Sequence, residues 1–313
     1  MQTAATHDGN PPPVLSPDVE QGEKLLGQGD AKGARAAFLR AIKIHPEDAR
    51  AYFDLGFALE QLRRPTRAMR AYRRALAIKP NFFQAQNNLA LMLRERGAKR
   101  EAVQLLRKSA SENPNSASTQ ANLAMALEDV GDRAGALAAY ERSLSLAPDG
   151  LMARLNYGLL LIQVGKPDQG CDQLEEARSA AAGDRPALLA IGQGFRLCKR
   201  GEDAVGVMEE AIAAGDGQPT PALLSELALA QRVVGDRQAA KQSLEEALAL
   251  DDRYATAYYI LGNMAGSAQR YEQAAAYYDR YLKLEPQGPL AGRAQERLRI
   301  VRNLKARTRR ADH

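Results

Sequence analysis

Three asparagines, Asn88, Asn122 and Asn156, recur at intervals of 34 residues. An asparagine amide carries both a hydrogen-bond donor and an acceptor, so it can pair with the N–H and C=O groups of an extended peptide. One amide per interval would offer regularly spaced contacts to a polypeptide backbone, with little preference for its side chains. Whether the asparagines can do this depends on the elements that carry them.

The sequence holds little that suits catalysis. Its histidines are His7, His45 and His313, which cannot be combined into a metal site at ligand spacing. The stretch "IGQGFRLCKRG" contains a Gly-x-Gly, but it lies within one of the predicted pairs of helices described below, and no strand precedes it. We therefore interpret Gly192 as a helix-packing residue instead of part of a phosphate-binding loop. We expect no enzyme activity, no metal and no cofactor.

Composition favours a folded helical protein. The chain has 313 residues, of which 45% are hydrophobic and 26% charged. The net charge of +5 is unevenly placed: residues 289–313 hold eight Lys or Arg and two acidic residues, or +6. The remainder holds 35 basic and 36 acidic residues, or −1, so the body of the chain is balanced and its end is basic.

A repeat of 34 residues organises most of the chain. We place eight units at 15–48, 49–82, 83–116, 117–150, 151–184, 185–220, 221–254 and 255–288, of which the sixth has 36 residues. Small residues recur at two positions of every unit, because helices that pack closely must present small side chains where their backbones approach. At position 8 these are Gly22, Gly56, Ala90, Ala124, Gly158, Gly192, Ala228 and Gly262; at position 20 they are Ala34, Ala68, Ala102, Ala136, Gly170, Ala204, Ala240 and Ala274.

The remaining pattern predicts two amphipathic helices per unit. Positions 4, 7, 8 and 11 share one helical face, and positions 20, 24 and 27 lie along the second helix. Gly29-Asp30, Gly131-Asp132 and Gly235-Asp236 mark the turn between the two helices. Several units end at a proline, which stops the second helix: Pro46, Pro80, Pro114, Pro148 and Pro286.

The stretches "YFDLGFALEQLRRPTRAMRAYRRALAIKP" and "YYILGNMAGSAQRYEQAAAYYDRYLKLEP" resemble the consensus of the tetratricopeptide repeat (TPR) family. The resemblance covers residues 15–288. It implies an all-α fold, a right-handed α-solenoid of stacked helix pairs. We expect a disordered N-terminal tail over 1–14, a capping helix over 289–306 and a basic tail over 307–313.

Two units depart from the pattern. The first has Asp18 and Gln21 where apolar residues are usual, which predicts a frayed N-terminal cap. The joints on either side of the sixth unit, "AAAGDRPA" and "AAGDGQPTPA", are rich in Gly and Pro. We interpret the sixth unit as the weakest internal interface, either a hinge or a degenerate repeat.

The face of the first helices that is turned away from the packed face predicts a concave binding groove. Its candidate residues lie at positions 5, 6 and 9 of units two to five: Phe53, Asp54, Phe57, Asn87, Asn88, Leu91, Asn122, Met125, Asn156 and Leu159. The row of amides resembles the asparagine ladder in the TPR superhelices of O-GlcNAc transferase and kinesin light chain, which hold extended peptides. The alternative is that asparagine simply suits a solvated helix face here. The N-terminal "NPPPVLSP" is an alternative occupant of the groove.

Charged recognition is less favoured. A carboxylate clamp for chaperone C-termini needs cations at positions 2, 5 and 6, where units three to five offer none. Arg63, Arg67, Arg70 and Arg74 form a stripe on unit two, and "KARTRR" ends the chain. We interpret both as solvated faces; an acidic protein, RNA or an anionic membrane is the alternative. No aromatic residues alternate with these cations, so nucleic acid is not favoured as a partner.

Cysteine content and the termini bear on location. Cys171 and Cys198 lie 27 residues apart with no CxxC partner, so we interpret both as helical core residues, with a disulfide or metal site as the alternative. No basic segment followed by an apolar run opens the chain, and no apolar run reaches the roughly 20 residues of a membrane span. A cytoplasmic location is expected, or a periplasmic or envelope-associated one if a leader has been removed.

These observations predict a non-catalytic adaptor or scaffold that binds an extended peptide segment of a protein partner in its concave groove. One alternative is a self-oligomerising scaffold, as in some bacterial TPR proteins of organelle and envelope assembly. Another is an accessory subunit of a glycosyl-transfer or nucleic-acid-handling complex. The identity of the partner does not follow from the sequence.

Overall fold

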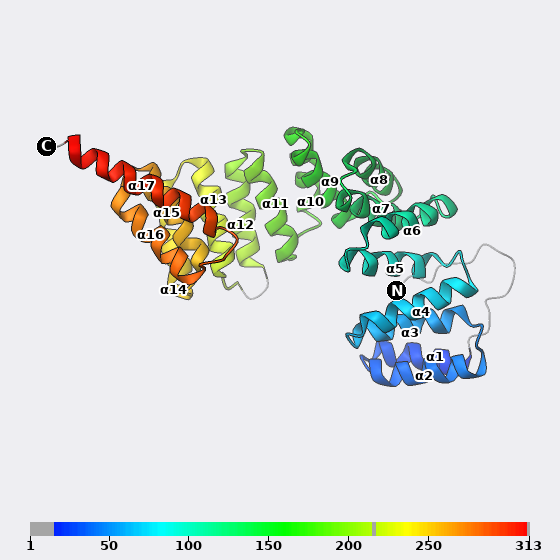
Figure 1. Cartoon of the computed structure of the whole chain (residues 1–313). Helices are drawn as coiled ribbons and strands as arrows, with labels where there is room; N and C mark the ends of the chain where they lie inside the picture. Colours follow the sequence, from blue (N-terminus) through cyan, green and yellow to red (C-terminus); the bar gives the residue numbers. More distant parts are fainter. Residues whose placement is uncertain (1–15, 215–216, 312–313) are drawn as a thin grey trace. The chain divides into compact units, whose positions relative to one another are not determined.

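The computed structural model describes residues 16–214 and 217–311, with side chains through Ala306, and this part of the chain folds into 17 α-helices without a strand (Figure 1). The helices are α1 Pro17–Gly27, α2 Ala31–Ile44, α3 Ala49–Gln61, α4 Pro65–Ile78, α5 Phe83–Glu95, α6 Lys99–Glu112, α7 Ala117–Asp129, α8 Arg133–Leu146, α9 Leu151–Gln163, α10 Pro167–Arg178, α11 Arg185–Leu197, α12 Gly201–Ala213, α13 Pro221–Val234, α14 Arg237–Leu250, α15 Ala255–Ser267, α16 Tyr271–Leu284 and α17 Ala291–Ala311. None of the helices in these ranges has the length and apolar composition needed to cross a membrane.

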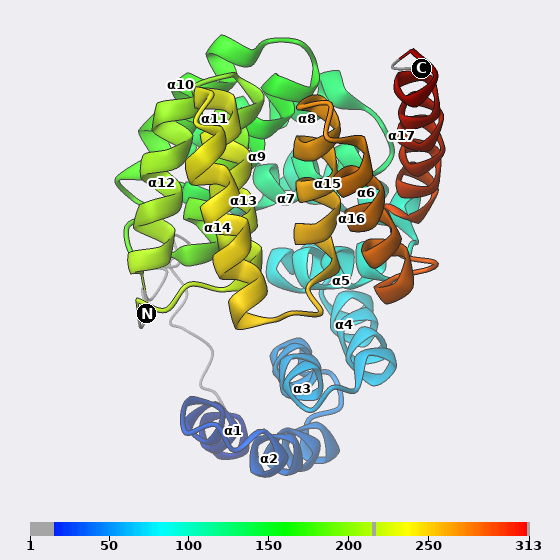
Figure 2. The ribbon, with the colours of Figure 1, turned by 90° about the vertical axis from the view of Figure 1, so that its left-hand side faces the viewer.

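Each predicted repeat contains one helix pair, with the odd-numbered helix first and the even-numbered helix second. The fold class is therefore confirmed: the chain is an all-α solenoid of helix pairs. It divides into two compact parts, an N-terminal body that ends at Pro148 and a C-terminal body that begins at Asp149. The N-terminal body holds repeats 1–4, and the C-terminal body holds repeats 5–8 and α17. Within each body, consecutive helix pairs lie side by side (Figures 1 and 2).

The turn inside each helix pair lies where the Gly-Asp pairs predicted it, and its residue at position 15 has a left-handed backbone conformation. Glycine occupies this place in five repeats, for example Gly29 at φ +81° and Gly131 at φ +82°. Only glycine adopts this conformation without a steric cost. Asp132 then caps the second helix, because its carboxylate accepts a hydrogen bond from the Gly135 N–H at 3.0 Å. Arg63, Lys199 and Gln269 hold the same backbone conformation without glycine.

The small residues at positions 8 and 20 lie where the two helices of a pair touch. In repeat 2, a Cβ added to Gly56 would fall 2.6 Å from the ring of Tyr72, which fills position 24. In repeat 5 the contact is between backbones: a Cβ on Gly170 would lie 2.5 Å from the carbonyl oxygen of Gly158. Close approach is therefore the physical reason for the small residues, and a bulky residue at position 24 closes the space beside them.

The N-terminal helix is fully formed. The Ser16 hydroxyl caps α1 by accepting from the Val19 N–H, and Gly22 is buried against Phe38. Asp18, which replaces an apolar residue, forms an ion pair with Arg40 of α2 at 2.8 Å. Repeat 1 therefore closes the stack with a polar edge. The predicted tail over 1–14 lies outside the described residues.

Helix α17 covers the C-terminal end of the stack. Ala294, Leu298 and Val301 are buried in one cluster with the aromatic residues of α16. Arg302 pairs with Asp279 at 2.8 Å, and Lys305 pairs with Glu272 at 2.8 Å. The helix extends beyond the predicted end at residue 306, so it includes part of the segment that was expected to form a basic tail.

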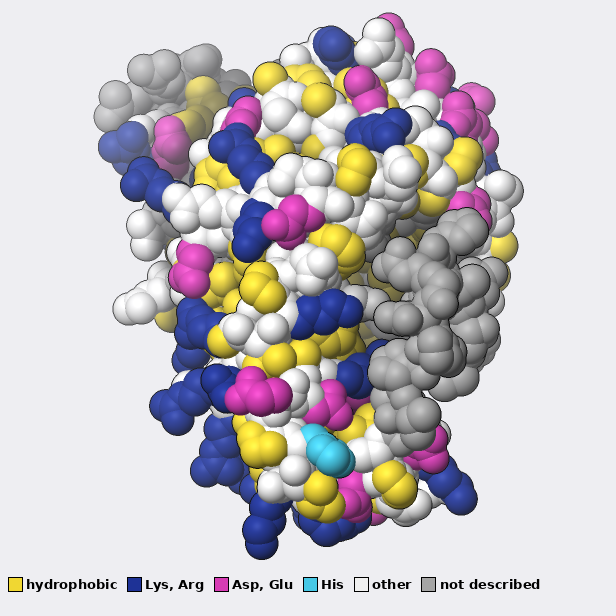
Figure 3. Space-filling model, turned by 90° about the vertical axis from the view of Figure 1, so that its right-hand side faces the viewer, with side chains coloured by type: hydrophobic (Ala, Val, Ile, Leu, Met, Phe, Trp, Pro, Cys, Tyr) yellow, Lys and Arg dark blue, Asp and Glu magenta, His cyan; other side chains and the backbone are white. Residues whose placement is uncertain are grey.

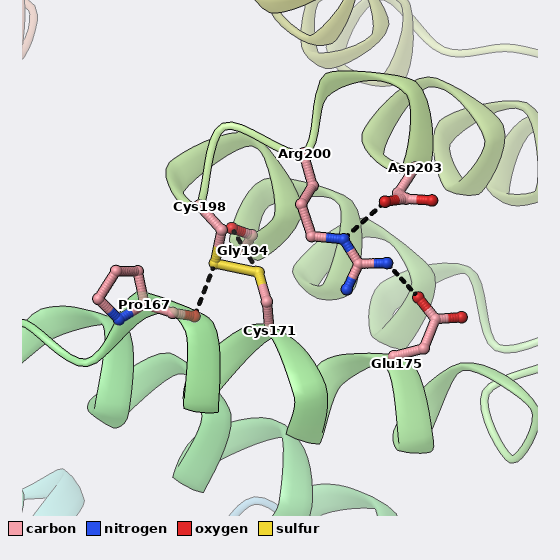
Figure 4. The surroundings of a disulfide bond; sticks show 7 residues. All are labelled: Pro167, Cys171, Glu175, Gly194, Cys198, Arg200 and Asp203. Atoms are coloured by element: carbon pink, nitrogen blue, oxygen red, sulfur yellow. Dashed lines mark hydrogen bonds and ion pairs between the residues drawn. A yellow bond between two sulfur atoms is a disulfide. The ribbon is translucent and has the colours of Figure 1, made fainter.

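A disulfide joins Cys171 to Cys198, so the preferred interpretation of two unlinked core cysteines was wrong (Figure 4). Cys171 is indeed buried, on α10, but Cys198 is the half-exposed residue that follows α11. The bond connects repeat 5 to repeat 6. Beside it, Arg200 pairs with Glu175 of α10 at 2.9 Å and with Asp203 at 2.6 Å, which adds a charged link across the same interface.

Repeat 6 is not separated from its neighbours, although its glycines and prolines suggested a hinge. A single buried cluster runs through repeats 5 to 7 and includes Leu174, Phe195 and Leu223. The Arg185 guanidinium donates to the carbonyl oxygen of Ala211 at 3.1 Å, at the end of α12. The chain instead divides between repeats 4 and 5, at Pro148–Asp149. Residues 215–216 of the second Gly-rich joint lie outside the described residues.

We predict that Gly170→Ala lowers the free energy of unfolding by about 1–3 kcal/mol, because the added methyl group meets backbone atoms that cannot move aside. Gly206→Ala is the matched control: a Cβ on this helical glycine of α12 would meet only the end of the Arg178 side chain, at an ordinary contact distance of 3.6 Å. That change should stabilise the protein by up to about 1 kcal/mol through helix propensity. Urea unfolding of both variants checks the pair, and equal effects at the two sites would contradict the close-approach explanation.

Candidate binding surface

The candidate residues lie on four successive first helices. Phe53, Asp54 and Phe57 lie on α3, Asn87, Asn88 and Leu91 on α5, Asn122 and Met125 on α7, and Asn156 and Leu159 on α9. The first eight belong to the N-terminal body, whereas Asn156 and Leu159 belong to the C-terminal body. Each body is therefore considered separately.

An apolar row at position 9 reaches the surface of the N-terminal body. The Phe57 side chain is 43% exposed, and Leu91 and Met125 are half-buried. The packing of helices within a pair uses the other face of these helices, through Leu59, Leu93 and Leu127, which are buried. The fold therefore leaves the position 9 row accessible. In the C-terminal body, Leu159 at the same position is half-buried.

The Asn88 side chain forms a hydrogen bond within the protein. Its side-chain Nδ2 donates to the Tyr72 hydroxyl at 3.2 Å, and Tyr72 in turn donates to the Glu60 carboxylate. Burial, together with the hydrogen bond to Glu60, raises the pKa of Tyr72. The asparagine is therefore part of a network that connects repeat 2 to repeat 3, and its Oδ1 is the atom left for a ligand.

Asn87 makes the next connection along the stack. Its Nδ2 donates to the Thr119 hydroxyl of α7 at 3.0 Å, while its Oδ1 is buried with no hydrogen-bond partner. The hydrogen bond to Thr119 connects repeat 3 to repeat 4. The buried Oδ1 without a partner is energetically costly and offsets part of that stabilisation.

Asn122 has a different environment. Its side chain is half-buried, and within the described ranges its amide makes no hydrogen bond. The same holds for Asn156 in the C-terminal body, judged on the residues that the structure describes. The three asparagines that repeat every 34 residues are thus not equivalent, since one is engaged in a network and two keep both polar atoms available.

Phe53 is a packing residue as well as a surface residue. Its ring lies 4.9 Å from the ring of Phe82 and 5.7 Å from that of Tyr72, measured between centroids. The Arg50 guanidinium lies 5.8 Å above the same ring. These contacts join α3 to α4 and to Phe82, the N-cap residue of α5, and hold Phe53 in place beside the apolar row.

Asp54 is not the exposed groove residue that the repeat position predicted. Its side chain is buried, at 5% exposure, and its carboxylate pairs with Arg50 at 2.7 Å. Burial raises the pKa of Asp54 to about 7; Arg50 opposes this effect, and nearby Glu23 adds to it. The sequence did not reveal this, because the burial comes from the packing of α3 against its neighbours.

The predicted arginine stripe borders a second, outer groove in the N-terminal body. Arg67, Arg70 and Arg74 of α4 face Arg35 of α2 across a cavity of ≈ 270 Å³, with Tyr52 among its apolar lining residues. Arg74 pairs with Glu47 at 3.1 Å and lies 5.8 Å above the Tyr52 ring. Lys and Arg side chains gather along one edge of this part of the chain in Figure 3.

The acidic, histidine and cysteine side chains of the described residues bear on the question of a metal site. No group of three or more His, Cys, Asp or Glu side chains in residues 16–214 and 217–311 is arranged to hold a metal ion. The raised pKa of Asp54 is explained by burial, with a smaller contribution from nearby Glu23.

Comparison with known families agrees with the helix-pair architecture. Two tetratricopeptide repeat profiles match the sequence, one over residues 19–81 and 225–289 and the other over residues 58–177. The chain belongs to the tetratricopeptide repeat family. Such repeats generally serve as scaffolds for protein interaction, on the concave surface of the stack. No curated protein sequence matches the chain.

Solved structures of TPR proteins share the fold at low sequence identity. A tetratricopeptide repeat protein from Parabacteroides merdae is 17% identical, with a TM-score of 0.60 over 81% of this chain and 98% of that one. The Cut9–Hcn1 hetero-tetramer of the APC/C is 16% identical, with a TM-score of 0.59 over 88% and 55%. Yeast Tom70 is 16% identical, with a TM-score of 0.53 over 93% and 64%. At these identities the likeness concerns the fold alone.

Tyrosine–glutamate hydrogen bonds, which were not predicted from the sequence, join the two helices of repeats 2 and 4. Tyr72 bonds Glu60, and Tyr140 bonds Glu128 at 2.6 Å, in each case between positions 24 and 12 of one repeat. The sequence does contain a signal for these bonds, because a tyrosine at position 24 and a glutamate at position 12 occur together in both repeats.

The raised pKa of Asp54 predicts a pH-dependent loss of stability. In an unfolded chain an aspartate ionises near pH 4, whereas the folded protein keeps Asp54 protonated up to about pH 7. The folded state therefore binds more protons in this window, so stability falls as pH rises from 4 to 7 and then levels off. The effect is on the order of 4 kcal/mol.

Asp54→Asn should flatten this slope, because the amide cannot ionise. The variant should gain stability relative to the wild type at pH 8 and differ little at pH 5. Guanidinium unfolding at both pH values measures the difference, with Asp168→Asn as the control at an exposed carboxylate of α10. Parallel pH profiles of wild type and Asp54→Asn would show that Asp54 ionises normally.

Proposed function

We propose that the N-terminal body binds an extended, partly apolar peptide of a protein partner along its first helices. The observation that carries the proposal is the accessible apolar row of Phe57, Leu91 and Met125, which is accompanied by the unpaired amide of Asn122. Apolar side chains that the fold leaves exposed in a row are typical of an interaction surface. The protein is a non-catalytic adaptor or scaffold on this proposal.

The spacing of the row favours one peptide conformation. Contacts join α5 directly to α7, and directly packed helices lie about 8–10 Å apart, so Leu91 and Met125 recur at about that interval. A polyproline II segment rises about 3.1 Å per residue and has three residues per turn, which returns a side chain to the same face every ~9 Å. A peptide with an apolar residue at every third position would therefore place one side chain beside Leu91 and the next beside Met125.

The amides supply the polar half of the recognition. A polyproline II segment makes no internal hydrogen bonds, so its N–H and C=O groups are free to pair. Asn122 can both donate and accept, whereas Asn88 can accept through Oδ1 while Nδ2 stays with Tyr72. Recognition should therefore depend more on Asn122 than on Asn88. Asn156 and Leu159 offer the same pair of side chains in the C-terminal body.

Selection from a phage-displayed library of random 12-residue peptides tests the proposal. Bound peptides should share apolar residues at three-residue spacing. Asn122→Ala should weaken the binding of a selected peptide about 5-fold, the value of one hydrogen bond of about 1 kcal/mol, without loss of stability. Leu91→Ser should weaken it further. Asn303→Ala, the same change on the exposed face of α17, is the control.

Selected peptides without the three-residue spacing, or binding that both groove variants leave unchanged, would overturn the proposal. Asn88→Ala adds an internal check, because it removes a partner of Tyr72. That variant should lose about 1 kcal/mol of stability, unlike Asn122→Ala. Light scattering of each sample shows whether self-association, the alternative function, contributes to the signal.

We also propose that the protein works in an oxidising compartment, which favours the periplasmic or envelope-associated location over the cytoplasmic one. The disulfide between Cys171 and Cys198 supports this, because such bonds persist outside the reducing cytosol. It closes a loop with a sequence separation of 27 residues. By chain entropy, that cross-link should contribute about 3–4 kcal/mol to stability.

Rapid acid quenching of cells followed by thiol alkylation and mass spectrometry tests the location. Both cysteines should escape alkylation unless the sample is first reduced. Reduction of the purified protein should lower its melting temperature, and the double variant Cys171→Ala, Cys198→Ala should not respond to reductant. Free thiols in the quenched cells would place the protein in a reducing compartment.

A further inference from the structure

A cavity between repeats 7 and 8 of the C-terminal body has no role in the proposed peptide binding. Its volume is ≈ 440 Å³, and all four helices of the two repeats contribute to its walls. Arg232 comes from the end of α13, Arg237 and Lys241 from α14, and Arg270 from the residue before α16. It lies at the end of the repeats where the first helix turns into the second, so it is separate from the row at position 9.

The cavity carries a strong positive charge. Four cations line it and no Asp or Glu does. Lys241 forms an ion pair with Glu245 at 2.9 Å on the same helix. Across the described part of the chain, no carboxylate lies within ion-pair distance of Arg232, Arg237 or Arg270. The cavity thus brings three guanidinium groups without a carboxylate partner to one place.

Arg232 shows that this concentration is costly. Its side chain is half-buried, and burial lowers its pKa; the charges of Arg297, Arg196 and Arg237 act in the same direction. A guanidinium that is partly desolvated among other cations opposes folding unless an anion offsets it. An oxyanion placed in the cavity would supply the missing charge and accept hydrogen bonds from several arginines at once.

Favourable interaction with the helix dipoles does not explain why all three unpaired arginines line the cavity. Arg232 lies in the last turn of α13, where a cation interacts favourably with the helix dipole. Arg237 is the first residue of α14, and Arg270 is the N-cap residue of α16. A cation at a helix N-terminus is unfavourable to the dipole. Two of the three unpaired arginines are therefore placed against the local electrostatics of their own helices.

The other residues that line the cavity indicate the kind of chemical group to which the anion is attached. Leu261, Met264 and Tyr277 form an apolar wall, and Gln273 donates to the Tyr277 hydroxyl at 3.3 Å. Ser267 and Gln238 add neutral hydrogen-bonding groups. The cavity thus has a cationic side that suits an oxyanion and an apolar side that suits the group to which the oxyanion is attached.

We propose that this cavity between repeats 7 and 8 binds the phosphate group of a phosphate monoester. Arginine forks pair with phosphate and carboxylate alike, so geometry admits both. Charge separates them: a phosphate monoester carries about −1.5 to −2 at pH 7, twice that of a carboxylate, and it offers three acceptor oxygens to four cations. The phosphate belongs either to a phosphorylated side chain of a peptide or to a small molecule.

Isothermal titration calorimetry of the full chain tests the proposal with four probes: inorganic phosphate, O-phospho-L-serine, a phosphoserine peptide, and the same peptide with glutamate at that position. Phosphate and phosphoserine should bind, and the glutamate peptide should bind at least 10-fold more weakly than the phosphopeptide. Tighter binding of the phosphopeptide than of O-phospho-L-serine assigns the source to a protein, and equal binding assigns it to a small molecule.

Variants connect the binding to the cavity. Arg232→Gln and Arg270→Gln should each weaken phosphate binding about 10-fold or more. Arg299→Gln, which removes the same charge from an exposed position of α17 outside the cavity, should have little effect. Arg232→Gln should also raise the melting temperature without ligand, because it relieves repulsion, and should abolish the further rise that phosphate gives the wild type.

Three results would overturn the proposal. Equal binding of phosphate to Arg232→Gln and Arg299→Gln would show that general positive charge is responsible. Equal affinity for the glutamate peptide and the phosphopeptide would assign the cavity to carboxylates. Absence of binding at tens of millimolar phosphate, with the wild type folded, would show that the arginines are simply tolerated.

Discussion

Close approach of the two helices in each repeat is the constraint on which the rest of this structure depends. Where Gly158 faces Gly170, the backbones themselves touch, and in repeat 2 Gly56 accommodates the ring of Tyr72. A side chain at either place would separate the pair. Because every repeat solves this problem with a small residue at the same two positions, the helix pairs are nearly identical units and can stack in a regular way.

Regular stacking determines which residues can act together. The helix face used for close packing holds position 8, so the opposite face holds positions 6 and 9 at constant intervals. A partner that is itself regular, such as an extended peptide, can match those intervals. The apolar row of Phe57, Leu91 and Met125 is thus a consequence of packing on the other side of the same helices. The fold supplies the spacing, and the side chains supply the affinity.

Departures from regularity carry the more individual features of this protein. The disulfide connects repeat 5 to repeat 6 beside an arginine, Arg200, that bridges the same interface to Glu175. These links lie next to the joints with the most glycine and proline, where the repeat pattern is weakest. At repeats 7 and 8, arginines without partners surround a cavity, and their electrostatic cost is unexplained by packing. Both features depart from what the repeat alone requires.

The sequence by itself determined the period, the two helices per repeat, the position of the turn between them and the small residues at the helix contact. All of these depend on interactions within one repeat or between adjacent repeats, so a local pattern is enough to predict them. Only the tertiary structure decided that Asp54 is buried with Arg50, that Asn88 binds Tyr72 whereas Asn122 is unpaired, and that Cys171 meets Cys198. These outcomes depend on how neighbouring helices rotate and approach one another, which places atoms from different repeats within a few ångströms and which no spacing in the sequence specifies.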